Sequence, residues 1–331
     1  MQRIHTRASL SATGLTVAFS VVLAACSGGA AATPGSSSPP GSPATSPGGS
    51  PTPAGSPTAP PTATPVPSPT AEVGQVEHPT GAADVVLRIE SGGGFMPFGF
   101  LATQAPNFTL YGDNTVIFRP TTDPGGTGFP PFVKAVMNAQ QVDALLTFAL
   151  TQGHLSAARE SYVIGGIADA PTTYFKIDAG GVKKQVGVYG LGITTGQPNP
   201  DAADFAAFAK LADVLNGFEA EVRRGQVVSA DTYVPEQYRA ILIESQGMEG
   251  RNPWPWTDLK VTDFKVDPDQ SSTRLAAITA EQAAKVATVP SGGAPGIPIA
   301  SPDGKMTFSL SLRPMLPGDK VQPEMLPSLG F

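Results

Sequence analysis

The segment Phe108–Phe118 reads FTLYGDNTVIF, and it indicates how the folded part of the chain is built. Two runs rich in aromatic and β-branched residues flank a Gly-Asp-Asn sequence, whose residue types tolerate the positive φ angles of tight turns. The stretch therefore predicts an antiparallel hairpin with strands over Phe108–Tyr111 and Thr115–Phe118.

Further strands are expected on both sides of this hairpin. They are Val85–Ile89, a second hairpin of Thr173–Ile177 and Val182–Tyr189, Ala240–Glu244, and a last strand near the C-terminus. In that last strand Met306, Phe308, Leu310 and Leu312 alternate with Thr307, Ser309, Ser311 and Arg313. Strict alternation predicts one buried face and one wet face, and Arg313 falls on the wet face.

Three helices are expected between the strands. The first covers Ala139–Gln152, with Asn138 as its N-cap and Gly153 at its end. The second begins with Asn199 as N-cap and Pro200 in the first turn, and it runs to Arg224.

The third helix begins at Thr279, where Thr279 and Gln282 have the spacing of a capping box. Hairpins interrupted by single helices predict an α+β fold with a largely antiparallel sheet and about three helices. We expect an α+β domain over residues 79–225 and a second half or subdomain over 226–331 packed on the first.

The N-terminus differs from the rest of the chain. Arg3 and Arg7 precede a short apolar run at Leu15–Leu23, which has the length of a signal-peptide core. The segment closes with Leu-Ala-Ala-Cys at residues 23–26, which resembles the lipobox of bacterial lipoproteins. That resemblance implies removal of residues 1–25, acyl chains on Cys26, and a lipid-anchored protein on the extracytoplasmic face of the cell membrane.

Residues 26–78 are expected to form a disordered tether. Ser, Gly, Pro, Thr and Ala make up nearly all of residues 27–71, so this stretch has too little apolar surface to offset the entropy of ordering. Its many prolines favour extended conformations, which suit holding a domain away from a membrane.

Three segments of the body carry a second resemblance. ADVVLRIESGGGF (83–95), LYGDNTVIF (110–118) and GIADAPTTYFKIDAGGVKKQVGVYGLG (166–192) together resemble a group of uncharacterised bacterial lipoproteins and related domains of unknown function. The likeness covers much of 83–225 and more loosely the remainder. It implies a hairpin-and-helix architecture and brings no activity with it.

The composition argues against several classes of function. The formal net charge is -6, and no basic cluster exceeds Lys183-Lys184 or Arg223-Arg224, so we expect no nucleic-acid partner. Neither G-x-S-x-G, H-E-x-x-H nor C-x-x-C occurs, and no cofactor or metal site is predicted. Asp267 and Asp269 could contribute to a calcium site, although the glycine and the distal glutamate of an EF-hand loop are missing. Glu160, Asp169 and Asp178 could supply paired carboxylates for glycoside cleavage, but their spacing in sequence does not place them together.

Two aromatic segments are the candidate contact residues. Trp254 and Trp256 lie in a proline-stiffened stretch, and Phe95 and Phe98 lie in a Gly/Pro loop. Such rings stack on sugars or anchor a protein partner, whereas the alternative is that they are buried in packing.

We therefore expect a non-catalytic binding or interaction domain on a lipid anchor, with an envelope glycan or protein as partner. The alternatives are a cell-envelope hydrolase that uses carboxylates and a purely structural envelope protein. The sequence leaves the oligomeric state open.

Overall fold

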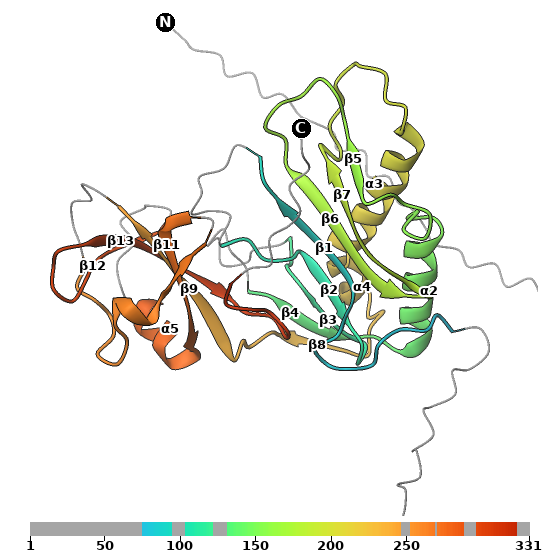
Figure 1. Ribbon diagram of the computed structural model, residues 1–331. Helices are drawn as coiled ribbons and strands as arrows, with labels where there is room; N and C mark the ends of the chain where they lie inside the picture. The colour runs from blue at the N-terminus through green and yellow to red at the C-terminus, as the bar shows by residue number, and fades with distance from the viewer. Residues whose placement is uncertain are drawn as a thin grey trace, which may run out of the picture. The chain divides into compact units, whose positions relative to one another are not determined.

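The computed structural model describes residues 75–94, 103–121, 131–245, 252–268, 270–287 and 296–322 (Figure 1). These residues contain thirteen β-strands, which form two sheets, and four α-helices. Among the named strands, every pairing is antiparallel except that of β5 (Ser161–Val163) with β7 (Val182–Tyr189). The predicted α+β class with largely antiparallel pairing is therefore confirmed.

The larger sheet, here called sheet A, has eight strands in the order β5-β7-β6-β1-β2-β3-β4-β8. Its other strands are β1 (Val85–Gly92), β2 (Phe108–Tyr111), β3 (Thr115–Phe118), β4 (Val133–Val136), β6 (Thr172–Ala179) and β8 (Ser229–Thr232). Both predicted hairpins are present, as β2–β3 and β6–β7. The first strand lies in the middle of the sheet, between β6 and β2.

Helices α2 (Ala139–Leu150), α3 (Ala202–Asn216) and α4 (Glu219–Arg223) lie on one face of sheet A (Figure 1). Leu146 and Phe208 bring the helices into one apolar core with Leu110, Val116 and Phe175 of the sheet. Burial of this core is the main stabilising contribution of the larger sheet, because apolar area removed from water contributes about 25 cal/mol per Å².

The opposite face of sheet A is also covered at β2 and β3. All eight residues of these two strands are buried. A second apolar cluster on that face joins Tyr111, Ile117 and Phe132 to Leu316, which follows the last strand of the chain. The C-terminal part of the described chain therefore returns to pack on sheet A.

The smaller sheet, here called sheet B, has five strands in the order β10-β11-β9-β13-β12. They are β9 (Gln237–Glu244), β10 (Lys265–Asp267), β11 (Gln270–Thr279), β12 (Ile297–Ala300) and β13 (Thr307–Pro314), with a 3-10 turn η1 (Val261–Asp263) and helix α5 (Ala280–Ala287) between them. Both sheets belong to the unit of the chain that spans residues 67–331. The change from one sheet to the other falls between β8 and β9, so the predicted boundary at Gly225 lies before the last strand of sheet A.

Two helix starts are confirmed in atomic detail. The Asn138 side chain accepts from the Gln141 N–H at 2.9 Å, and the Gln141 side chain accepts from the Asn138 N–H at 2.8 Å. Thr279 and Gln282 form the same reciprocal pair at the start of α5. Both are capping boxes, which satisfy backbone N–H groups that a helix leaves without partners.

The second helix differs from its prediction at both ends. It begins at Ala202 with Asp201 as N-cap, because the Asn199 side chain accepts from the Asp201 N–H and forms a turn before the helix. It ends at Asn216, and Gly217 separates it from the short helix α4. The break lets the Phe218 ring pack edge-on against two aromatic rings of the β2–β3 hairpin, at centroid distances of 5.2 and 5.3 Å.

Candidate functional site

Residues 75–80, here called the root, dock on sheet A at the point where the tether composition ends. The Val76 N–H donates to Asp143 Oδ1 of α2 at 2.6 Å, and the Gly180 N–H of the β6–β7 turn donates to the Glu77 carbonyl at 2.7 Å. Gly112 lies so close to the root that a Cβ atom there would stand 2.3 Å from the Pro79 carbonyl oxygen. Glycine is therefore required at 112 for the root to lie where it does.

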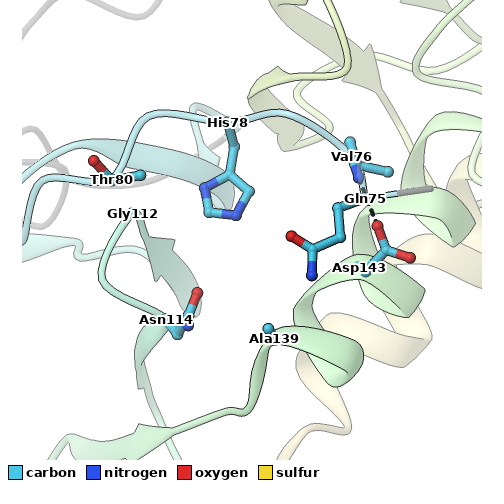
Figure 2. Close-up of a pocket in the computed structure, with 8 residues that line it drawn as sticks. All are labelled: Gln75, Val76, His78, Thr80, Gly112, Asn114, Ala139 and Asp143. Carbon is cyan, nitrogen blue, oxygen red and sulfur yellow. Dashed lines mark hydrogen bonds between the residues drawn. The ribbon is translucent and has the colours of Figure 1, made fainter. Parts of the chain in front are cut away.

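A cleft of about 180 Å³ lies between the root, the β2–β3 turn and the start of α2. Figure 2 shows the His78 ring, the Gln75 amide and Asn114 pointing towards this space. The His78 Nδ1 lies 2.7 Å from the Pro79 carbonyl oxygen, a contact that requires Nδ1 to carry the proton. When His78 is neutral, its Nε2 is then an acceptor. The cleft thus combines an imidazole acceptor with two amide groups, which suits a small polar ligand.

The two predicted tryptophans lie in sheet B. Trp256 is only 3 % exposed, and its indole N–H donates to the Gln282 carbonyl at 2.9 Å. Trp254 is partly buried, and its N–H donates to the Leu259 carbonyl at 2.8 Å. Their rings pack together and against Phe264.

This placement matches the packing alternative for Trp256, whose ring is enclosed by protein and whose only hydrogen-bond donor is used within the chain. A contact role for the tryptophans stays a prediction, and only the partly buried Trp254 presents ring surface for it. Phe95, Phe98 and Cys26 lie outside the described residues, so their predicted roles also stay predictions.

The topology keeps two of the candidate carboxylates, Asp169 and Asp178, apart. Asp169 precedes the start of β6, and Asp178 lies near the end of that eight-residue strand. A strand rises about 3.3 Å per residue, so these two side chains are separated by far more than the roughly 5 to 10 Å that a glycosidase pair requires. Asp178 instead pairs with Lys183 across the hairpin, at 2.5 Å. Within the described residues there is no group of three or more potential metal ligands, and Asp269 lies outside them.

The structure shows a third cluster that the sequence analysis missed. Residues 315–320, here called the strap, follow β13 and carry Asp319 against sheet A. Asp319 Oδ2 lies 3.1 Å from a guanidinium nitrogen of Arg313, and its Oδ1 lies 3.8 Å from Arg88 of β1. All three side chains are at most 13 % exposed. The prediction that Arg313 lies on the wet face of its strand is therefore wrong.

Arg313 is buried because the strap covers the polar face of β13 at this end of the strand. Along most of β13 the alternation holds, since Phe308 and Leu310 are buried and Ser309 and Ser311 are only partly covered. Near Arg313 the strap turns back, and its carboxylate supplies the counter-charge that a buried guanidinium needs. The position of Arg313 among the polar residues of its strand does not reveal that it is buried, because its partner Asp319 lies in a different segment.

Burial shifts the pKa of several groups in this cluster. Burial raises the pKa of the Glu90 carboxyl, although Arg88 and Arg313 act in the opposite direction. Burial also raises the pKa of Tyr111. It lowers the pKa of Arg239 to about 10, and the nearby charge of Arg313 adds to that effect. The cluster therefore contains charged groups that are buried away from solvent.

The chain matches no protein-family model, no curated protein and no solved structure. Among the described residues, no helix has the length and apolar character needed to cross a bilayer.

Proposed function

We propose that this chain is a lipid-anchored extracytoplasmic protein whose folded body is a non-catalytic binding or interaction domain. The observation that carries the proposal is the order of the N-terminal segments: a basic start, a short apolar run, Leu-Ala-Ala-Cys at residues 23–26, and a tether without charges over residues 27–71. A two-signal or two-chain lipid anchor is stable where one acyl chain is marginal.

The docked root supports this proposal. The predicted tether leads into a segment held by Asp143, Gly112 and Gly180, so a lipid on Cys26 would be connected to a defined place on the body. The polar cleft lies at this same place (Figure 2). We infer that the cleft, with side chains from the root and from sheet A, is the contact site for a small polar group such as a sugar unit of the envelope.

Anchoring is tested by Cys26→Ser in the full chain, with Ser27→Ala as the matched control. We expect the wild type and the control to remain in the membrane fraction after a salt wash, and Cys26→Ser to move to the soluble fraction or stay unprocessed. Mass spectrometry of the mature protein should find acyl chains on residue 26. A mature start at another residue, or equal retention of a Cys26→Ser chain from which residues 1–25 have been removed, contradicts the proposal.

Binding at the cleft is tested by proton NMR of the histidine rings. The full chain has three histidines, and removal of residues 1–25 leaves His78 and His154. On titration with N-acetylated sugars and short glycan fragments, we expect saturable shifts of the His78 ring resonances. His154, which lies 3.4 Å from Asp204 on α3, serves as the internal control. Shifts that are equal at both rings, or absent from both, remove the cleft as a contact site.

A further inference from the structure

Two buried arginines lie side by side on neighbouring strands of sheet B. Arg239 of β9 and Arg313 of β13 are directly opposite in register, so their side chains project from the same face. Arg239 is 3 % exposed and Arg313 is 6 % exposed. Like charges directly opposite on a sheet destabilise it, and burial increases that cost.

The described negative charges compensate only one of these arginines directly. Asp319 pairs with Arg313 and also lies close to Arg88. Arg239 donates to the Lys320 carbonyl oxygen, which is a neutral acceptor. Among the described residues, no carboxylate lies within ion-pair distance of Arg239. A buried guanidinium without an ion-pair partner is destabilising, so a negative group beside Arg239 would be favoured.

The hydrogen-bonding groups of the two arginines are also incompletely used. The Nε–H groups of both Arg239 and Arg313 are buried and have no hydrogen-bond partner. Buried donors are nearly always satisfied in folded proteins, and exceptions call for an explanation by an ion or ligand. A guanidinium group presents its N–H donors as a planar fork, which suits the oxygens of a carboxylate or a phosphate.

We propose that Arg239 and Arg313 form a binding site for an oxyanion, namely the phosphate, sulfate or carboxylate group of a ligand. The inference rests on the proposed binding function and adds a chemical class of ligand at a second place on the body. An oxyanion there accepts from the free Nε–H groups and adds to the negative charge of Asp319, which acts on Arg239 without forming an ion pair with it. It also relieves the repulsion between the two arginines.

The test measures the thermal unfolding midpoint of the full chain in detergent. Sodium phosphate, glycerol phosphate and acetate are each titrated at constant ionic strength against sodium chloride. Because a ligand that binds only the folded state stabilises it in a concentration-dependent way, we expect a saturable rise of several degrees with at least one oxyanion and none with chloride. Comparison of the three salts separates a phosphate preference from a carboxylate preference.

Three variants complete the experiment. Arg239→Gln should remove the response, and Arg239→Lys, which keeps the charge but loses the fork, should weaken it. Arg224→Gln is the matched control, because Arg224 pairs with Glu221 and both side chains are exposed. It should respond as the wild type does.

A wild-type chain that gains no more stability from any oxyanion than from chloride overturns the proposal, whether or not the variants fold. Equal responses in the wild type and in both Arg239 variants overturn it as well. Neither result affects membrane retention through Cys26 or the NMR response of His78, so failure here is distinguishable from failure of the proposed function.

Discussion

The root and the strap both pack on sheet A, but they are fixed by different forces. The root is held by backbone hydrogen bonds to Asp143 and the Glu77–Gly180 contact, and by close packing on Gly112. The strap is held by the apolar Leu316 and by the buried ion pairs of Asp319. The root is thus held by close packing and hydrogen bonds, and the strap by an apolar contact and buried ion pairs.

This difference determines how each contact fails. A root held by close packing is sensitive to a single added carbon atom and insensitive to the charge of distant groups. A strap held by a buried carboxylate loses its stability when that charge is removed, because the arginines then remain buried without compensation. Substitutions in the root and in the strap should therefore differ in the size and the kind of their effects.

Asp319→Asn should have the largest effect. The substitution keeps the shape of the side chain but leaves Arg313 and Arg88 without their shared counter-charge, which costs about 3 to 5 kcal/mol of unfolding free energy. Urea unfolding followed by fluorescence measures the loss. Asp303→Asn, at an exposed turn of sheet B, is the control and should unfold near the wild-type midpoint. A small effect of Asp319→Asn would show that packing of Leu316 holds the strap.

Gly112→Ala should displace the root. The new methyl group would stand 2.3 Å from the Pro79 carbonyl oxygen, so the root has to move, at a cost of about 1 to 3 kcal/mol. We expect lower stability and changed His78 ring resonances. The control is Gly165→Ala, because a Cβ atom at Gly165 meets nothing within 4 Å. Unchanged His78 resonances in Gly112→Ala would mean that the root docks without this close approach.

Asp143→Ala removes the acceptor of the Val76 N–H and leaves the packing at Gly112 in place. The loss of one hydrogen bond of this kind costs about 1 kcal/mol. Hydrogen exchange should become faster at the Val76 amide and stay unchanged in the strap. Asp213→Ala on the exposed side of α3 is the control. Faster exchange in the strap as well would show that the root and the strap are coupled, which contradicts their being held independently.

Glu90→Gln tests the charge dependence on the strap side and should have the smallest effect. Burial raises the pKa of Glu90 above its ordinary value of 4.5, so below that pH the carboxyl is protonated in both the folded and the unfolded chain. Between pH 4.5 and the raised pKa the unfolded chain releases the proton while the folded chain retains it, so the stability of the wild type falls relative to a chain without that acid, and the fall ends once the folded acid has ionised. The stability of Glu90→Gln relative to the wild type should therefore increase from about pH 4 to about pH 8.

The measurement is urea unfolding of both chains at several pH values. A relative stability that is flat or that decreases with pH contradicts the predicted direction. Because Arg88 and Arg313 act on Glu90 against its burial, the slope also reports how strongly the strap-side charges interact.

Much of the fold was predictable because its signals are local. The Gly-Asp-Asn turn, the N-cap at Asn138, the capping box at Thr279 and the α+β class follow from residues close in sequence, and the structure confirms each of them. The end of the second helix was not predictable in this way. Its break at Gly217 depends on Phe218 packing against Phe108 and Phe118, which lie about a hundred residues earlier in the chain.

The candidate sites were less predictable for the same reason. His78 and Asn114 carry no motif, and they meet only because Gly112 admits the root beside the β2–β3 turn. Arg313 has the periodicity of an exposed residue, and its burial follows from a strap that contacts β1 of the other sheet. The periodicity of a single strand cannot contain information about such a contact.

The return of the strap to β1 has a consequence for the order in which the protein matures. Arg88 and the covered face of β2 and β3 receive their last contacts from residues 315–320, which are synthesised long after the strands themselves. Contacts between segments so far apart in sequence form slowly, and they leave apolar surface open until they do. We therefore expect the nascent body to depend on assistance from chaperones until residues 315–320 have been synthesised and have packed on sheet A.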